Sequence, residues 1–319
     1  MIETFGEKGL EARVLASKLL RKIAALLGAV LLACLPSCAP AEEPAGPAAA
    51  GGFVIAEMKS SGFNSAAAES REGVSADFSS LTEGYVAISA VSESRLKLQV
   101  LLGEGKYTYD LKNDGTPEIF PLNMGDGEYS FRVMENISGT KYAELWSETR
   151  AVSLASEFEP FLRPSQYVNY DVDSECVARA RELAAACADD IEVVAAVYGM
   201  LVESIEYDHE KAASVQSGYL PDPDTTLATR KGICFDYAAL AAAMLRSLGV
   251  PCRLITGYVH PNEIYHAWNE VYIESQGWIT VKIEVSAESW KRVDITFAAG
   301  GVSEEQLDDD SLYTTRYVY

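Results

Sequence analysis

The sequence predicts two successive folded parts, an all-β segment followed by an α+β segment. Between about Gly51 and Val152, apolar residues recur at every second position, which is typical of strands with one buried face. From about Phe158 the spacing changes to that of helices, and the last part returns to strands. The expected organisation is a signal segment at residues 1–38, a tether at 39–52, a β domain at 53–155 and an α+β domain at 156–319.

Three alternating runs carry the β prediction. They are Leu96 to Val100, Tyr107 to Leu111 and Tyr129 to Val133, and sequences rich in Asn, Asp and Gly separate them. Several short strands at this spacing favour a sandwich of the immunoglobulin or fibronectin type. Nothing in this segment has the residue pattern of a catalytic centre, so a spacer or binding platform is expected.

The second segment should contain helices over residues 171–190 and 190–208, and a third over Phe235–Leu248 that Gly249 ends. The Pro- and Asp-rich residues 217–232 before the third helix are expected to form a loop. Strands are expected at residues 253–259, 266–274, 277–285 and 289–297, in one antiparallel sheet.

The N-terminus has the pattern of an export signal. Arg21 and Lys22 precede an apolar run, Ile23 to Leu35, which is too short to span a bilayer comfortably. The following segment resembles a bacterial lipoprotein signal in which Cys38 carries the lipid, with Cys34 as a competing position. We therefore expect an exported protein on the extracellular face, bound to the membrane only through an N-terminal lipid anchor; an uncleaved anchor or simple secretion is the alternative.

Charge excludes one class of partner. The 319 residues include 26 basic and 47 acidic side chains, a net charge of -21, whereas nucleic-acid binding requires a basic face. No metal cluster has plausible ligand spacing and no calcium loop is recognisable, so no metal or cofactor is expected. The expected partner is a protein or peptide substrate, and the oligomeric state is open.

Three of the six cysteines are expected to be structural. Cys176 and Cys187 are expected on one helix, about 16 Å apart, which exceeds the reach of a disulfide. They and Cys252 should pack as small apolar groups. A Cys234–Cys252 disulfide is the alternative in an exported protein.

Cys234 differs from the others because it follows Gly232 and falls in the first turn of a predicted helix. Unpaired amides and the helix dipole at that place stabilise a thiolate and lower the pKa of a thiol. Asp236 in the same turn opposes this effect. Cys234 is therefore a candidate nucleophile, with a buried apolar cysteine as the alternative, and its backbone N–H is a candidate oxyanion donor.

A thiol nucleophile needs an imidazole to take and return its proton, and the imidazole needs an orienting acceptor. His209 is expected at the surface and His260 in a turn, whereas His266 opens a predicted strand, which is a rigid mount. His266 is therefore the expected partner of Cys234. The alternative is a histidine packed among Tyr265 and Trp268.

Three blocks of sequence resemble the core of the transglutaminase-like superfamily, whose fold is similar to that of papain-type cysteine proteases. They are KGICFDYAALAAAMLRSLGVPCRLITGYV, YHAWNEVY and WKRVDITF, and the resemblance covers roughly Phe158 to Gly301. It implies that Cys234 is the nucleophile, His266 the general base and acid, and Asp294 the group that orients His266. It also implies acyl transfer from amide bonds through a thioester, as a peptidase, an amidase or a protein transglutaminase. The alternative is a non-catalytic surface module with the same fold.

The aspartate follows from the family pattern, in which it falls four residues after a tryptophan. Four residues after Trp278 stands Lys282, which cannot accept a hydrogen bond from imidazole, whereas four residues after Trp290 stands Asp294. Residues 277–289 are then an extra strand and turn inserted before the motif. The alternatives for the orienting group are Glu284 and, more weakly, Asn269.

Overall fold

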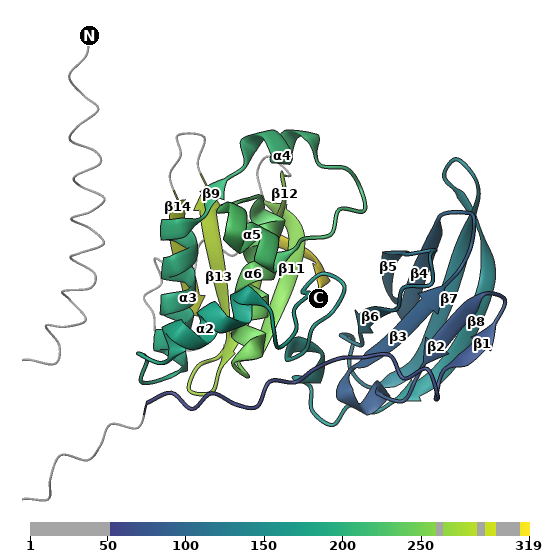
Figure 1. Cartoon of the computed structure of the whole chain (residues 1–319), viewed down its shortest axis with the longest axis horizontal. Helices are drawn as coiled ribbons and strands as arrows, with labels where there is room; N and C mark the ends of the chain where they lie inside the picture. Colours follow the sequence, from purple (N-terminus) through teal and green to yellow (C-terminus); the bar gives the residue numbers. More distant parts are fainter. Residues whose placement is uncertain (1–51, 260–263, 286–290, 298–312) are drawn as a thin grey trace, which may run out of the picture. The chain divides into compact units, whose positions relative to one another are not determined.

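The computed structural model describes residues 52–259, 264–285, 291–297 and 313–319 (Figure 1). Of Val259, Ile264, residues 282–285 and residues 291–297, only the backbone is described. Cys34, Cys38 and His260, and with them the expected signal segment, lie outside the described residues. Within the ranges that are described, no helix is both long enough and apolar enough to cross a bilayer.

The N-terminal part is all β, as predicted, and consists of two antiparallel sheets. One has the strand order β1-β2-β3-β6 and the other β5-β4-β7-β8. The three alternating runs coincide with β4, β5 and β7, which confirms that prediction. The strands are β1 (Glu69–Arg71), β2 (Val74–Asp77), β3 (Tyr85–Ala90), β4 (Leu96–Leu102), β5 (Gly105–Leu111), β6 (Glu118–Pro121), β7 (Gly127–Ser138) and β8 (Lys141–Val152).

Alternation along β4 determines which face of its sheet is buried. Leu96, Leu98 and Val100 are fully buried, whereas Lys97 and Gln99 between them are partly exposed. Burying every second side chain in the core leaves the intervening polar positions on the opposite, outward face. That outward face of the sheet β5-β4-β7-β8 is available to a ligand.

The second part contains the three predicted helices; α3 and α6 begin and end within four residues of the expected positions, whereas α2 is shorter than expected. They are α2 (Glu175–Ala184), α3 (Asp190–Ser204) and α6 (Cys234–Ser247), joined by α4 (His209–Ser214), α5 (Pro223–Thr229) and the short parallel pair β9 (Glu206–Tyr207) and β10 (Lys231–Gly232). Helix α5 was not predicted, because residues 217–232 were expected to form a loop. Asp222 caps α5 by accepting a hydrogen bond from the Thr225 N–H, and Pro223 occupies its first position, where no N–H is needed.

The expectation that Cys176 and Cys187 share one helix is wrong. Helix α2 ends at Ala184, and the N–H of Cys187 donates to the Ala184 carbonyl in a turn. Asp189 then caps α3 by accepting from the Glu192 N–H. Cys176, Cys187, Cys234 and Cys252 are all free thiols, so the alternative Cys234–Cys252 disulfide is not formed.

The predicted antiparallel sheet is confirmed, with the order β14-β13-β12-β11-β15. Its strands are β11 (Cys252–Val259), β12 (Ile264–Ile273), β13 (Gly277–Val285), β14 (Lys291–Phe297) and β15 (Tyr313–Val318), the last of which was not predicted. Helix α6 packs against β11 and β12 and is itself covered by α2, α3 and α5 (Figure 1). This arrangement places the first turn of α6 beside β12.

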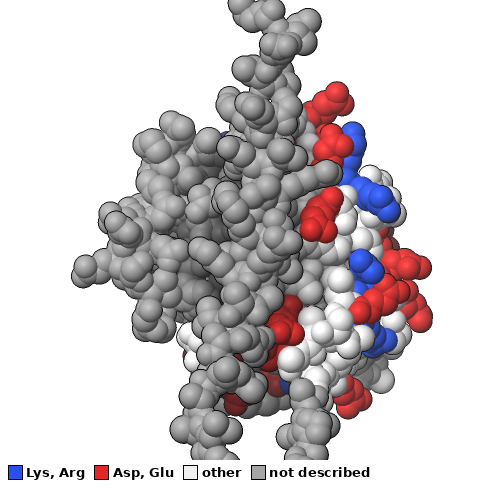
Figure 2. Space-filling view, turned by 90° about the vertical axis from the view of Figure 1, so that its left-hand side faces the viewer, with Lys and Arg blue, Asp and Glu red and all other residues white. Residues whose placement is uncertain are grey.

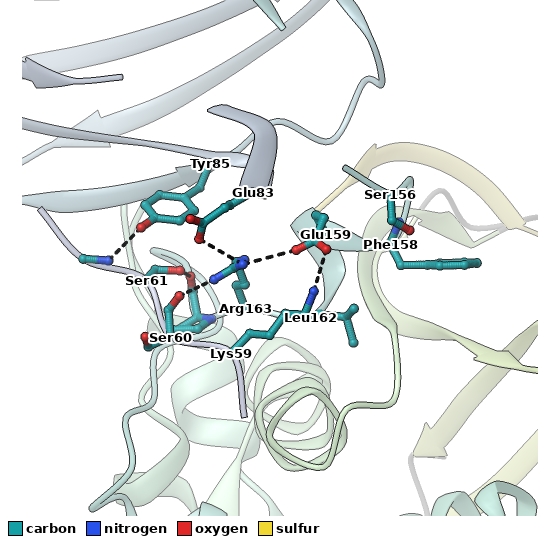
Figure 3. Close-up of polar contacts among 12 residues, drawn as sticks. Lys59, Ser60, Ser61, Glu83, Tyr85, Ser156, Phe158, Glu159, Leu162 and Arg163 are labelled. Carbon is teal, nitrogen blue, oxygen red and sulfur yellow. Dashed lines mark hydrogen bonds and ion pairs between the residues drawn. The ribbon is translucent and has the colours of Figure 1, made fainter. Parts of the chain in front are cut away.

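An ionic joint connects the β segment to the start of the second part (Figure 3). Lys59 Nζ lies 2.5 Å from Glu159 Oε1, and Arg163 Nη2 lies 3.2 Å from the other oxygen of the same carboxylate. Arg163 also pairs with Glu83 at 2.9 Å and donates to the Ser60 carbonyl at 2.5 Å. Glu159 is buried and pairs with both Lys59 and Arg163, so this joint attaches the β segment firmly to the second part.

Candidate active site

Cys234 is the first residue of α6, and its neighbours fix the turn that presents it. The Asp236 carboxylate accepts the Ile233 N–H at 2.8 Å, which satisfies one of the unpaired amides at the helix start. At Gly232, a Cβ would come within 2.8 Å of the Asp236 side chain. A residue without a side chain is therefore required two positions before the cysteine.

Burial raises the pKa of the Cys234 thiol to about 11, and the amides of Ala267 and Phe235 act in the opposite sense. The amides at the helix start lower the pKa as expected, but the net shift is upward. Removing the thiolate from water costs more free energy than the hydrogen bonds of these amides supply. With its pKa raised by burial, the Cys234 thiol needs a base to become a nucleophile at neutral pH.

His266 lies on β12, opposite Gly257 of β11, and lines the same hollow as Cys234. The hollow has a volume of about 720 Å³. Gly257 allows a close approach, because a Cβ there would collide with the backbone of Thr314 and lie 2.8 Å from the ring of Trp268. The structure therefore brings together the predicted nucleophile and the predicted base.

The strand order determines how far Asp294, the residue predicted to orient His266, lies from the strand of that histidine. Strand β13 lies between β12, which carries His266, and β14, which carries Asp294, and Asp294 is in register with Lys282 of β13. Two inter-strand steps amount to about 9.5 Å. A strand is present at the residues predicted for it, and it separates the backbones of His266 and Asp294 by at least that distance.

Strand β13 carries Glu284, the alternative residue for orienting His266. The pairing of β12 with β13 runs from Ile273 opposite Gly277 to Asn269 opposite Val281. Glu284 lies three residues beyond this paired stretch, on the strand next to β12.

Asn269, the weaker alternative, is engaged elsewhere. Its amide group donates to the Ala238 and Arg253 carbonyls at 3.0 and 3.2 Å, and its oxygen accepts from the Tyr198 hydroxyl at 2.8 Å. The side chain is fully buried between β12 and the helices. These bonds make Asn269 a structural link between β12, α6 and α3.

One wall of the hollow comes from the chain between β9 and α5, which the sequence did not single out. Lys211 Nζ lies 2.6 Å from Asp236 Oδ2, and the Tyr219 hydroxyl donates to Asp236 Oδ1 at 2.5 Å. Lys211 also donates to the Tyr219 hydroxyl at 2.6 Å and lies over its ring. This clamp holds residues 211–219 against the first turn of α6; the nearest signal in the sequence was Asp236, two residues after the cysteine.

Tyr207 on β9 was also missed. It lines the hollow beside Cys234, and its hydroxyl faces the backbone amide of that residue, the candidate oxyanion donor. Burial raises the pKa of Tyr207, and the Cys234 amide acts against that rise. The ring packs edge-on against His209, which is exposed at the start of α4 as expected.

Acidic and basic side chains are interspersed on the described part of the face shown in Figure 2. Within the described ranges, no three His, Cys, Asp or Glu side chains lie close enough to hold a metal ion. Cys234 and His266 both line the hollow, so a thiol and an imidazole are available there.

Comparison with known proteins identifies the domain that carries these residues. The family model described as the transglutaminase-like superfamily matches residues 177–283, a range that includes Cys234 and His266. Mouse (Mus musculus) kyphoscoliosis peptidase is 31% identical over 138 residues, which are 40% of this chain and 19% of that protein. A protein-glutamine gamma-glutamyltransferase from Pseudomonas aeruginosa is 37% identical over 65 residues, which are 17% of this chain and 10% of that protein.

Among solved structures, red sea bream transglutaminase matches 65% of this chain and 49% of its own length, with 14% identity and a TM-score of 0.30. The chain spans only 19% of the length of the kyphoscoliosis peptidases of mouse and human. The match to the family model covers α2 through most of β13. Residues 177–283 therefore form a domain of the transglutaminase-like superfamily.

Proposed function

We propose that this protein transfers acyl groups from amide bonds through a thioester on Cys234. The observation that carries the proposal is that Cys234, at the start of α6, and His266, on β12, line one hollow of a transglutaminase-like domain. A partly buried thiol with a raised pKa that shares a hollow with an imidazole is suited to general-base activation.

In the proposed reaction, His266 takes the thiol proton while the sulfur attacks the amide carbonyl carbon. The C–N bond breaks, His266 gives its proton to the leaving amine, and a thioester remains on Cys234. Water or a second amine then attacks the thioester, gives a proton to His266 and releases the sulfur, which regains that proton. The backbone N–H of Cys234 is the proposed donor to the oxyanion, with the hydroxyl of Tyr207 beside it.

The acceptor of the acyl group decides between a peptidase and a cross-linking enzyme, and we favour hydrolysis. The names of the relatives support both outcomes, since one is a peptidase and the other a glutamyltransferase. The two reactions use the same nucleophile and base, so the substrate must distinguish them.

The proposed orienting group is an acidic residue of the strands beyond β12. The family pattern favours Asp294, whereas the strand order favours Glu284, because β13 is the direct neighbour of β12. An acceptor must come within about 3 Å of the imidazole N–H, which a neighbouring strand permits more readily than the next strand but one.

We further propose that the β segment is a sandwich of the immunoglobulin or fibronectin type on an exported lipoprotein anchored at Cys38. The support for the sandwich is the strand order, with β2-β3-β6 in one sheet and β5-β4-β7-β8 in the other. The support for export is the basic and apolar pattern of the N-terminus.

The test of the proposed chemistry is the rate of iodoacetamide labelling at each cysteine, followed by peptide mass spectrometry. We expect Cys234 to react first and His266→Ala to slow its reaction, with Cys176 and Cys252 unlabelled because they are buried. If Cys234 reacts as an ordinary free thiol and His266→Ala changes nothing, the chain is a non-catalytic module. If reactivity is found, a glutamine peptide with and without a primary amine separates transfer from hydrolysis.

A further inference from the structure

The hollow at Cys234 continues onto the β segment. Lys97, Thr108 and Asp110, from the outward face of β4 and β5, line the same hollow as the cysteine. Gly218, in the chain that walls the hollow, comes close to Asp110, since a Cβ there would lie 2.8 Å from its carboxylate. The β segment therefore forms part of the site and is not only a spacer.

A second hollow, of about 420 Å³, crosses the outward face of the sheet β5-β4-β7-β8. Lys97 and Thr108 line both hollows, so the two meet at these side chains. At its far end the second hollow reaches Tyr142 on β8. The three inter-strand steps from β5 to β8 span about 14 Å, or about four residues of an extended chain.

The attachment of the β segment keeps the two hollows aligned. Gln166, in the chain leading to α2, donates to the Asp110 carbonyl at 2.7 Å and to the Glu118 carboxylate at 3.0 Å. The Tyr107 hydroxyl of β5 accepts from the N–H of Val318 on β15 at 3.1 Å. With the ionic joint of Figure 3, these bonds hold β5 against the catalytic part at separate points.

The charge on this face favours an acidic ligand. Arg95 and Asp110 satisfy each other, with Arg95 Nη2 2.8 Å from Asp110 Oδ1. The Lys97 ammonium lies 5.1 Å from the centre of the Tyr142 ring. Among the described residues, no carboxylate forms an ion pair with it. The protein as a whole carries a net charge of -21, so an uncompensated cation here is a local exception.

We infer that the outward face of β4 and β5 is a substrate-binding site for an extended acidic peptide segment, whose carboxylate meets Lys97 while the adjoining amide lies at Cys234. An extended chain fits the length of the joined hollows. The tyrosine-rich wall near the cysteine suits a peptide, because tyrosine offers both an apolar ring and a polar hydroxyl. The placement of an amide at Cys234 rests on the proposed function, whereas binding of the acidic peptide does not depend on it.

Binding is tested on the full chain carrying Cys234→Ala, which removes turnover and leaves the hollows in place. The probe is a fluorescein-labelled peptide of about twelve residues, long enough to cross both hollows, with a central glutamine and aspartates on both sides. A second peptide has asparagine in place of each aspartate. Fluorescence anisotropy should show the aspartate peptide binding about tenfold more tightly, because only it can pair with Lys97.

Lys97→Glu should abolish this preference, and Lys97→Gln should reduce it. Lys112→Glu is the matched control: it makes the same charge change at an exposed turn of the β segment that lines neither hollow. The asparagine peptide reports on folding, because a misfolded variant would lose both peptides.

The inference is overturned if the Cys234→Ala protein binds neither peptide or binds the two peptides equally. It is also overturned if adding Lys97→Glu has the same effect as adding Lys112→Glu. Binding of the aspartate peptide without thiol-dependent turnover by the intact protein would leave this site standing and remove the proposed reaction. Turnover that Lys97→Glu does not change would leave the proposed reaction standing and remove this binding site.

Discussion

Lys211 Nζ lies 2.6 Å from Asp236 Oδ2, and this ion pair ties the chain after β9 to the first turn of the helix that begins with Cys234. Asp236 is completely buried and also accepts from Tyr219 and from the Ile233 amide. Burial lowers the pKa of Lys211, but its bonds to Asp236 and Tyr219 outweigh this and leave it raised. The wall of the hollow and the position of the nucleophile therefore depend on the same carboxylate.

Lys211→Met should lower the free energy of unfolding by about 3 kcal/mol, because it leaves a buried carboxylate without its cation. Urea unfolding measures the change. Lys231→Met, the same substitution at an exposed position before α6, is the control and should cost less than about 0.5 kcal/mol. Equal costs for the two variants would contradict a stabilising role for the clamp.

In His266→Ala, where no imidazole assists the thiol, the rate of Cys234 alkylation should rise about tenfold per pH unit and should not level off below about pH 10. The physical reason is that burial raises the pKa of this thiol to about 11, so the thiolate is a minor species at neutral pH. Stopped-flow labelling of the Cys234 thiol across the pH range checks this. A plateau by pH 7 in that variant would contradict a raised pKa of the thiol.

Glu284→Gln should slow acylation of Cys234 more than Asp294→Asn, by a factor on the order of 100, if the residue that orients His266 lies on the neighbouring strand. The pH dependence of the acylation rate and the thermal stability of both variants should be measured together. A larger loss with Asp294→Asn, at unchanged stability, would favour the residue that the family pattern identifies.

Arg246→Met should destabilise the protein by about 3 kcal/mol or more, because it leaves several buried carbonyl groups unpaired. Arg246 is fully buried and donates to the carbonyls of Cys252, Arg163 and Tyr319 at 2.8, 2.9 and 2.9 Å. Arg179→Met on the exposed face of α2 breaks only a surface pair with Glu182 and should cost less than about 1 kcal/mol. A cost for Arg246→Met no larger than for this control would contradict the account.

Local patterns predicted most of the elements. Period-two alternation predicted β4, β5 and β7, and the change to helical spacing predicted α2, α3 and α6. Helix α5 was missed although its signal is in the sequence: Asp222 and Pro223 form a cap and a first helical residue inside a stretch that looked like a loop. The end of α2 before Cys187 was missed because an alanine-rich sequence does not mark where a helix stops.

The parts of the site that depend on long-range packing could not be predicted. The pKa of Cys234 depends on how deeply the thiol is buried, and the helix start alone gave the wrong direction. The pairing of Lys211 with Asp236, and the contribution of Lys97 to the hollow, join residues far apart in the sequence. A strand over residues 277–285 was predicted, but its position between the strands of His266 and Asp294 follows only from the order of strands in the sheet.

The central claim, that Cys234 forms a thioester with the help of His266, is tested most directly by acylation with p-nitrophenyl acetate, a small ester that requires no knowledge of the natural substrate. The account predicts a burst of one p-nitrophenol per protein molecule, an acetyl group on Cys234 by mass spectrometry, no burst in Cys234→Ala, and a burst at least about 100-fold slower in His266→Ala. Acetylation of Cys234 at the same rate with and without His266, or the absence of any adduct on Cys234, would contradict it.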